Sequence, residues 1–298
     1  GTPPLCGELR LKPRRTYDYR NGSIPCRFAM YKLATAERLQ SQVVGEPGVE
    51  MLVNRFRRNL RHIGKWARRN GIASYRLYDS DLPEYAFAVD LYRDANDTVT
   101  AHVTVNEVKE EGVLTKARQS TGIQVVQRVL EIPQERVIVK SRRRQEGDAQ
   151  YARIDRKDTY DMVAEGDARF LVNLTDFHDT GLFLDNRFVR AYVKERSQGI
   201  RLLNLFAYTG SVTVSAVLGG AASSTTIDLS NTYVEWAAQN YELNGVDLNA
   251  HEIVRADCLA WLREAEKGLH GSDKYDLIYF DPPTFSNSKG MDESFDVQ

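Results

Sequence analysis

Cysteine is scarce in this sequence, which contains only Cys6, Cys26 and Cys258. An odd number of widely spaced cysteines predicts neither a disulfide framework nor a zinc site. The five histidines also lack the spacing that metal ligands need. We therefore expect reduced thiols and no metal site.

A long apolar segment is also missing. No stretch reaches the roughly 18 residues that a membrane-spanning helix needs. Residues 1–30 carry prolines and arginines where a signal peptide would have an apolar core. Both absences favour a cytoplasmic protein. The 298 residues are 42% hydrophobic and 27% charged, which fits a globular chain of about two domains.

Acidic residues are scarce in the first part of the chain. Residues 1–70 carry 15 Lys and Arg against 5 Asp and Glu, whereas the rest of the chain carries 25 against 36. The overall net charge of -1 conceals this asymmetry. A basic arm attached to an acidic body predicts a polyanionic partner, and nucleic acid is the leading candidate.

The basic part begins without clear periodicity. Residues 1–30 contain four prolines and predict a linker or the remnant of a preceding element. Residues 50–70 carry apolar side chains at helical spacing before Gly71, which predicts a helix. Its cations either contact phosphates or form a solvated face, and a run without acids favours phosphates. These cations are Arg55, Arg57, Arg58, Arg61, Lys65, Arg68 and Arg69.

A small α+β module is predicted after this helix. The expected strands around one helix at 113–130 are 75–78, 85–92, 99–105 and 137–139. Together with the basic helix they form an expected RNA-binding domain over residues 31–165. The basic cluster at 140–144 either extends the basic surface or forms a mobile loop.

Residues 166–298 are predicted to form an α/β domain. Two β-like runs, 169–174 and 181–189, precede a regular alternation of strands and helices. The expected strands are 201–206, 225–228, 252–255 and 275–280, and the expected helices are 210–218, 231–244 and 258–267. This alternation predicts a parallel sheet with a ligand site at the carboxyl ends of its strands.

The first two strands of this sheet end in residues that can bind a ligand. Tyr208, Thr209 and Gly210 form a tight turn whose backbone N–H groups can face a ligand, although turn chemistry alone also explains a glycine here. Asp228 lies 18 residues after Gly210, close to the spacing at which an acid binds a ribose diol. The alternative is that Asp228 and Ser230 only cap the next helix.

The last two strands end in the same way. Asp257 either reads an adenine edge or caps the following helix. Cys258 lacks a neighbouring base or basic cluster that would lower its thiol pKa, so we assign it to the pocket wall. The fourth strand leads into Asp281, Pro282 and Pro283, a stiff loop that offers an acceptor to a cofactor or a base.

Several of these segments resemble class I S-adenosylmethionine-dependent rRNA methyltransferases. The matching runs are residues 203–211, 226–230 and 281–289, with further matches at 76–85 and 179–187. Within that class the chain resembles the C-terminal methyltransferase half of the bacterial bifunctional large-subunit rRNA methyltransferase K/L. The resemblance covers most of the chain from about residue 26.

The resemblance implies S-adenosylmethionine as the cofactor and guanine N7 of 23S rRNA as the methyl acceptor. It implies a hairpin at residues 181–187 over the cofactor, which would place Asp185 and Arg187 near it. Residues 1–25 would be the tail of a preceding methyltransferase half. Because guanine N7 has a lone pair and no proton to lose, we expect Asp281 to position the substrate instead of acting as a base.

The fold of this family would continue beyond Gln298 with further strands. The sequence therefore predicts a C-terminally incomplete sheet in which the fourth strand is an exposed edge. Two other functions stay open. Cytosine-5 methylation of rRNA would need a cysteine nucleophile near the Asp281 loop. RNA binding without catalysis would need the sheet only as a scaffold.

Overall fold

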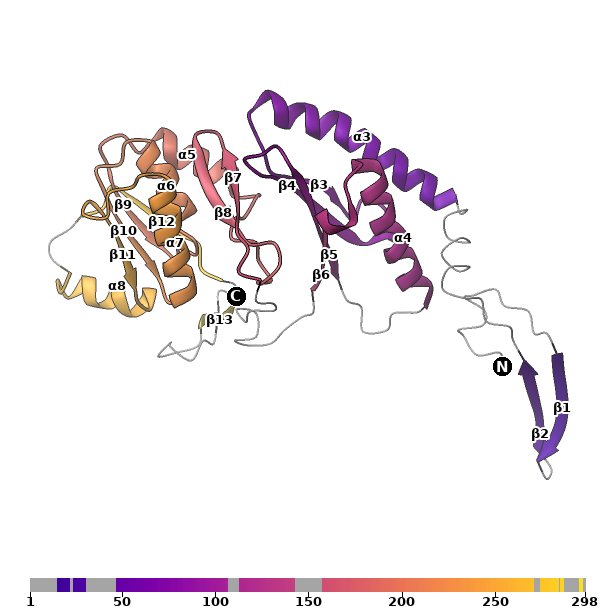
Figure 1. Cartoon of the computed structure of the whole chain (residues 1–298). Coiled ribbons are helices and arrows are strands. Elements are labelled where there is room, and N and C mark those ends of the chain that lie inside the picture. Colours follow the sequence, from indigo (N-terminus) through magenta and orange to yellow (C-terminus); the bar gives the residue numbers. More distant parts are fainter. Residues whose placement is uncertain are drawn as a thin grey trace. The chain divides into compact units, whose positions relative to one another are not determined.

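The computed structural model describes residues 15–21, 24–30, 47–106, 113–142, 157–270, 274–283, 285–286 and 295–296 (Figure 1). The chain divides into two compact units. One comprises Gly1–Gly64, Leu77–Val89 and Val103–Arg143, and the other comprises Lys65–Arg76, Asp90–His102 and Arg144–Gln298. The domain limits expected from the sequence stay a prediction.

Residues 15–30 contain a pair of strands that the sequence pattern did not indicate. Strands β1 (Arg15–Asn21) and β2 (Ile24–Met30) pair antiparallel, with Arg15 opposite Met30. Pro25 lies at the second position of β2, near the strand end where a proline is tolerated. Prolines and basic residues in this segment obscure the alternation that reveals a strand.

Helix α3 (Pro47–Arg69) confirms the predicted basic helix. Pro47 occupies the first helical position, where the missing N–H has no partner to lose. Glu50 lies in the first turn and Arg68 and Arg69 lie in the last, as the helix dipole favours. The helix therefore begins and ends where its sequence supplies favourable terminal residues.

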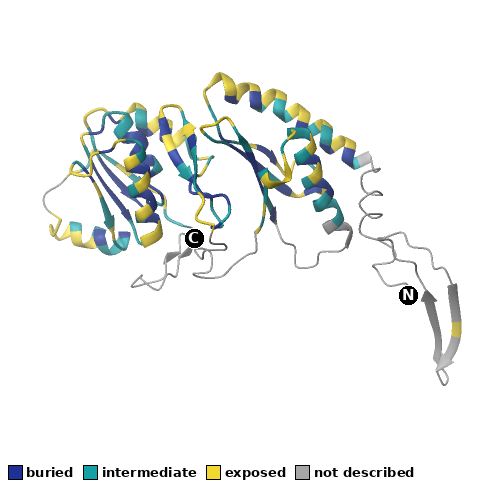
Figure 2. Ribbon diagram, viewed as in Figure 1, coloured by how far each residue is buried: buried dark blue, intermediate teal, exposed yellow. Residues whose placement is uncertain are grey.

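Helices α3 and α4 (Val113–Leu130) pack on one face of a four-stranded sheet. The strands, in spatial order, are β3 (Tyr75–Asp79), β4 (Phe87–Arg93), β5 (Val99–Asn106) and β6 (Val137–Arg142). A short 3-10 helix precedes β4 and another precedes β6; these are η1 (Pro83–Tyr85) and η2 (Gln134–Arg136). The Phe56 ring of α3 stacks on Tyr78 at 4.9 Å and lies 6.5 Å from Phe87. A Cβ at Gly122 of α4 would lie 2.5 Å from that same Phe87 ring, so the helix approaches closely because this residue is glycine. Figure 2 shows buried positions along the strands and exposed ones along the outer side of α3.

Strand β7 (Asp161–Glu165) pairs antiparallel with β8 (Ala168–Val172). The sequence predicted the second strand but missed β7. The predicted β-like run at 181–189, and with it the hairpin implied at 181–187, is wrong. Residues 181–186 form turns and a loop, and helix α5 (Arg187–Glu195) follows.

The burial pattern of α5 explains this correction. In a strand, Phe188 and Arg190 would lie on the same face. Phe188 is 73% exposed, whereas Arg190 is 1% exposed and lies on the same face as the buried Val193. The residues three apart share an environment and those two apart do not, which is the periodicity of a helix.

The C-terminal part forms the predicted Rossmann-like α/β structure. Its parallel strands, in spatial order, are β11 (His251–Arg255), β10 (Ser223–Asp228), β9 (Arg201–Leu205) and β12 (Leu277–Phe280), with helices α6 (Ser211–Leu218), α7 (Asn231–Leu243) and α8 (Cys258–Glu266) between them in the chain. Strand order reverses on the two sides of β9, the topology that places ligands at the carboxyl ends of strands. Two short strands, β13 (Phe285–Ser286) and β14 (Phe295–Asp296), pair antiparallel.

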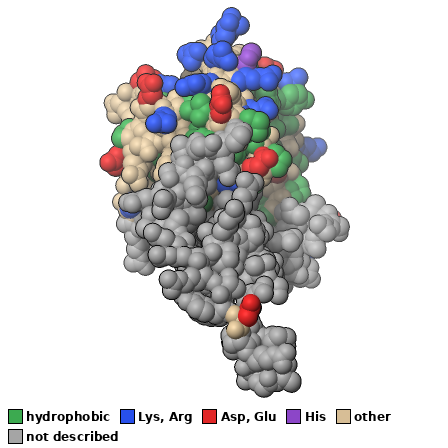
Figure 3. All heavy atoms as spheres, turned by 90° about the vertical axis from the view of Figure 1, so that its right-hand side faces the viewer, with side chains coloured by type: hydrophobic (Ala, Val, Ile, Leu, Met, Phe, Trp, Pro, Cys, Tyr) green, Lys and Arg blue, Asp and Glu red, His purple; other side chains and the backbone are tan. Residues whose placement is uncertain are grey.

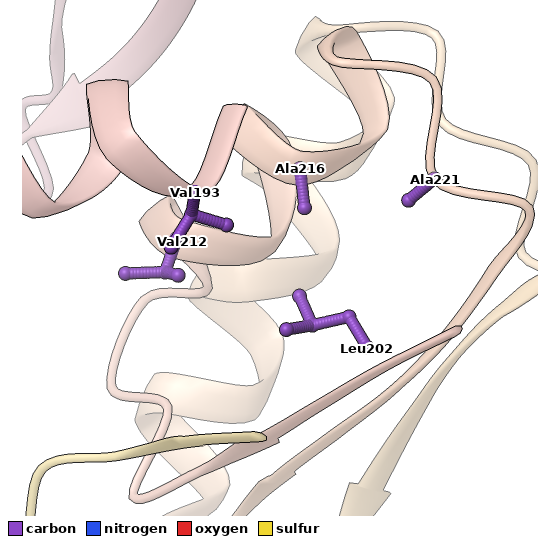
Figure 4. Close-up of a cluster of buried hydrophobic side chains, with 5 residues drawn as sticks. All are labelled: Val193, Leu202, Val212, Ala216 and Ala221. Carbon is purple, nitrogen blue, oxygen red and sulfur yellow. The ribbon is translucent and has the colours of Figure 1, made fainter. Parts of the chain in front are cut away.

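Both faces of the parallel sheet are covered by apolar side chains. On one face, a cluster from α5, α6, β9 and the connection after α6 packs together (Figure 4), and it consists of Val193, Leu202, Val212, Ala216 and Ala221. On the other face, Leu203 and Leu205 of β9 pack against Trp261 of α8. Burying each large side chain contributes about 1.5–3 kcal/mol. These two layers fix the strand ends on which the candidate site is built.

Within the described ranges, no helix is both long and apolar enough to cross a bilayer. The same residues contain no cluster of three or more histidine, cysteine or acidic side chains arranged to hold a metal ion.

Candidate functional site

The carboxyl ends of β9, β10 and β12 lie level with one another. Leu205 at the end of β9 pairs with Ile227 of β10 and with Phe280 of β12. Asp228, the last residue of β10, pairs with Arg255 at the end of β11. The loops that follow the four strands therefore emerge at one edge of the sheet, as the sequence predicted.

The loop after β9 has an unusual backbone. Phe206, Tyr208 and Gly210 all have positive φ angles, of 55°, 54° and 72°. Two of these residues carry side chains that disfavour this region by about 1–2 kcal/mol each. Four backbone donors hold the loop. Phe206 N–H donates to Cys258 Sγ at 3.2 Å, and Tyr208 N–H donates to Asp228 Oδ2 at 2.8 Å. Ala207 N–H donates to the Ile227 carbonyl at 3.0 Å, and Gly210 N–H donates to the Ala207 carbonyl at 2.9 Å. Backbone strain of this kind is stored preferentially at functional sites.

Gly210 begins helix α6 and admits no larger residue. A Cβ there would lie 3.0 Å from the Tyr241 ring and 3.1 Å from the Ala237 Cβ, in addition to the strain of the positive φ. The glycine therefore allows α6 and α7 to approach directly behind the loop.

Two side chains of the loop fasten it to the segment before α5. The Tyr208 hydroxyl accepts a hydrogen bond from Gly181 N–H at 2.8 Å, and the Thr209 hydroxyl donates to the Gly181 carbonyl at 2.7 Å. The Tyr208 ring packs between Phe183 at 4.9 Å and Tyr233 at 4.6 Å. These side chains bind protein groups, so any contact of this loop with a ligand is made by its backbone.

Asp228 is oriented by two backbone donors. Its Oδ2 accepts from Tyr208 N–H at 2.8 Å and its Oδ1 accepts from Ser230 N–H at 2.9 Å. Burial raises the pKa of this carboxyl to about 6. A carboxylate has about four acceptor sites, so Asp228 keeps acceptor capacity for the hydroxyl groups of a ribose. Ser230 is the N-cap residue of α7, but its hydroxyl makes no capping bond and is available to a ligand.

Asp257 is the N-cap of α8, the role weighed against ligand binding. Its Oδ1 accepts from Leu259 N–H and Ala260 N–H, each at 2.9 Å. Its Oδ2 makes no hydrogen bond within the described part of the chain. The cap therefore orients the carboxylate and leaves one oxygen for a ligand.

Cys258 lies behind the loop and is 3% exposed. Burial raises the pKa of its thiol to about 12. A thiol that stays protonated at neutral pH is not an effective nucleophile. Its place in the wall of the site stays a prediction.

Asp281 follows β12 and takes part in a small hydrogen-bond network. Its Oδ2 accepts from the Tyr279 hydroxyl at 2.9 Å and from Asn186 Nδ2 at 3.3 Å. Burial, together with the bond to Asp281, raises the pKa of Tyr279, so its phenol stays a donor. The carboxylate is exposed, and Pro282 and Pro283 beyond it are half-buried. The network holds Asp281 in place while one of its oxygens faces away from these donors.

Sequence reasoning missed Asn186, although it selected the residues on either side. Asp185 is exposed and forms no hydrogen bond within the described residues. The Arg187 guanidinium donates to Glu165 Oε2 at 3.0 Å and to the Ser74 carbonyl. Asn186 contacts a residue 95 positions away, and no local pattern signals such a contact.

The arrangement can bind a nucleoside. One carboxylate suited to a diol and further acidic oxygens lie at one edge of a Rossmann-like sheet. These features define an α/β protein that binds a nucleoside-containing cofactor. The sequence model of the S-adenosylmethionine-dependent methyltransferases matches residues 95–293, and the chain belongs to that family. Its cofactor is S-adenosylmethionine.

Two solved structures share the fold over nearly the whole chain. One is SMU.776, provisionally described as a methyltransferase and complexed with SAH, which is 21% identical with a TM-score of 0.66. The match covers 94% of this chain and 66% of that one. The other is a protein of Streptococcus mutans, provisionally described as a SAM-dependent methyltransferase, which is 20% identical with a TM-score of 0.63 and covers 90% of this chain and 64% of that one. This chain thus spans about two thirds of the length of these structures.

The side chains at the edge fit this cofactor by their chemistry. Asp228 presents acceptors for ribose hydroxyls, and Asp257 presents one acceptor that could meet an adenine amino group. Several carboxylates near one another also favour a cationic sulfonium centre.

Proposed function

We propose that this protein methylates large-subunit rRNA at guanine N7, with S-adenosylmethionine as the methyl donor. The observation that carries the proposal is the fixed Asp228 carboxylate among four aligned strand ends. The rRNA substrate is supported by the resemblance of residues 203–211, 226–230 and 281–289 to the methyltransferase half of enzyme K/L. The excess of basic residues over residues 1–70 supports a nucleic-acid partner.

The proposal assigns a cofactor role to each residue at the edge. Asp228 and Ser230 bind the ribose hydroxyls, and the backbone of Tyr208, Thr209 and Gly210 approaches the remainder of the cofactor. Asp257 reads the adenine edge through its unused oxygen, and Cys258 closes the wall. Asp185 and Arg187 are assigned to the cofactor by the resemblance alone, and the Arg187 guanidinium is bonded to Glu165 and to the Ser74 carbonyl.

The Asp281 loop positions the methyl acceptor. Pro282 and Pro283 keep the loop stiff, and the bonds from Tyr279 and Asn186 fix the carboxylate that receives a donor of the base. A bond forms between guanine N7 and the methyl carbon while the carbon–sulfur bond of the cofactor breaks. N7 has no proton to lose, so alignment and charge stabilisation suffice without a general base.

Cytosine-5 methylation is the weaker alternative. It needs a cysteine thiolate at the base, and Cys258, the cysteine at this edge, is buried with a pKa raised to about 12. A non-catalytic RNA-binding role would leave the S-adenosylmethionine of this family without a function.

Methyl transfer to protein-free large-subunit rRNA tests the proposal. We expect transfer of the labelled methyl group to yield 7-methylguanosine in nucleoside mass spectrometry. The product 5-methylcytidine would establish the alternative. RNA binding with no methylated nucleoside, from a chain that binds S-adenosylhomocysteine, would contradict the proposal. Asp281→Asn should lower transfer while leaving cofactor affinity nearly unchanged, because Asp281 acts on the acceptor.

A further inference from the structure

The outward side of α3 carries cations that have no partner among the described residues. Arg57, Arg58 and Arg61 are exposed, and none of them forms an ion pair or a hydrogen bond within the described residues. By contrast, Arg55 on the same helix lies 3.7 Å from Asp81. Neighbouring guanidinium groups repel one another, and an anion bound between them would relieve that repulsion.

These arginines border a hollow between α3 and α4. The hollow has a volume of about 600 Å³ and is lined by Asn54, Arg57, Arg58, Leu60, Arg61 and Val129. Leu60 and Val129 are half-buried and give the hollow an apolar surface, one from each helix. Figure 3 shows Lys and Arg side chains gathered near the top of this face, with hydrophobic side chains beside them.

The cationic and apolar side chains that line the hollow favour a ligand that is an anion with an apolar part. Each guanidinium offers a planar fork that matches phosphate oxygens. Residues four apart on a helix lie about 5–6 Å apart at their Cβ atoms, so one short segment of a polyanion can reach both Arg57 and Arg61. Leu60 and Val129 can contact the apolar faces of sugars and bases. A volume of this size falls within the range of roughly 300–1,000 Å³ for small-ligand pockets.

We propose that this hollow binds a single-stranded segment of the RNA substrate, with Arg57, Arg58 and Arg61 as ligands of its phosphates. The inference rests on the proposed function, because it names the part of the protein that holds that RNA. Asn54 supplies an amide that can bond a base edge or a sugar hydroxyl. The binding is electrostatic in its main part and falls with rising salt.

Fluorescence anisotropy with a labelled oligouridylate tests this site in the 298-residue chain. The double variant Arg57→Glu, Arg61→Glu should weaken binding roughly tenfold or more and reduce the slope of log affinity against log salt by about 2. The matched control is Lys267→Glu, Lys274→Glu, which makes the same change in net charge at exposed positions whose side chains have no partner in the described part of the chain. The control should change affinity by less than about threefold.

Three results would overturn the inference. The first is equal weakening by both double variants, which would reduce the effect to overall charge. The second is competition by polyglutamate as effective as that by unlabelled oligouridylate, which would favour an acidic protein partner. The third is an unchanged affinity in the Arg57 and Arg61 variant. If that variant still binds S-adenosylhomocysteine, the failure concerns this hollow and leaves the proposed methyltransferase function standing.

Circular dichroism melting should show that both double variants stay folded, since all four positions are exposed.

Discussion

The carboxyl edge of the parallel sheet and the outward face of α3 differ in whether their charged side chains are bonded to other groups of the protein. At the edge, Asp228 accepts two backbone N–H bonds, and Arg187 is paired with Glu165. On α3, Arg57 and Arg61 are exposed and unpaired within the described residues. Charges bonded to the protein keep one orientation, which suits a small molecule of fixed shape. Cationic side chains that are not bonded to the protein can change their orientation, which suits a flexible chain of phosphates.

Removing Glu165, a charge that is paired within the protein, should have the largest effect on stability. Glu165 pairs with both Arg187 and Arg190, and the Arg190 side chain is 1% exposed. Glu165→Ala would leave two guanidinium groups without their counter-charge and should lower the free energy of unfolding by roughly 3–5 kcal/mol. Denaturant unfolding measures this change.

The control for Glu165 is Asp167→Ala, which removes an exposed carboxylate paired with Lys194. It should cost less than about 1 kcal/mol. Similar losses of unfolding free energy in the two variants would show that the ion pairs of Glu165 stabilise the protein no more than the exposed pair of Asp167 does.

The second prediction concerns the close approach behind the strained loop. Gly210→Ala adds a Cβ that would lie 3.0 Å from Tyr241 at a φ of +72°. Gly245→Ala adds only the strain, because its φ is +67° and nothing lies within 4 Å of the new Cβ. We expect Gly245→Ala to cost about 1 kcal/mol in unfolding free energy, and Gly210→Ala to cost about 1–3 kcal/mol more and to weaken S-adenosylhomocysteine binding. Equal costs would mean that helix α6 moves freely to accept the methyl group.

The third prediction uses the titration of Asp228. Burial raises its folded-state pKa from 3.8 to about 6, so the folded state binds a proton more tightly than the unfolded state does. Its contribution to stability is therefore fully present below about pH 4 and is lost as the pH rises through about 6. Cofactor affinity should change in the opposite direction, because ionised Asp228 is the better acceptor for hydroxyl groups. Calorimetry with S-adenosylhomocysteine should show affinity rising with an apparent pKa near 6 in the wild-type chain and no such step in Asp228→Asn.

The smallest effect is expected at Asn186. Its bonds to Asp281 and Tyr279 are long, at 3.3 and 3.4 Å. Asn186→Ala should lower the rate of methyl transfer by up to about tenfold and leave cofactor affinity within about twofold, because it positions the acceptor loop only. A loss of cofactor affinity larger than the loss of rate would assign Asn186 to the cofactor instead.

The sequence predicted the parallel sheet because its strands are short apolar runs with polar residues directly after them. Asp228 and Asp281 could be chosen for the same reason, since position at a strand end is a local property. Nothing in the sequence indicated that Arg190 is buried, because its partner Glu165 lies in a distant segment of the chain. Asn186 was missed because its partners lie far along the chain. Local periodicity predicts elements, and contacts between distant segments are invisible to it.

The exposed arginines of α3 could be identified from the sequence, whereas the hollow beside them could not. A run of cations without acids was visible in the sequence, but the hollow that they border needs Val129 of α4. Only the packing of both helices on Phe87 brings these parts together.

Calorimetric titration of the wild-type chain, Asp228→Ala and Asp167→Ala with S-adenosylhomocysteine tests the central claim most directly. The account predicts binding to the wild type, equal affinity in Asp167→Ala, and a loss of roughly tenfold or more in Asp228→Ala, since each hydrogen bond to a charged acceptor contributes about 1.5–3 kcal/mol. Unchanged affinity in a folded Asp228→Ala variant would contradict it, because the carboxylate that the edge orients would then have no part in holding the cofactor.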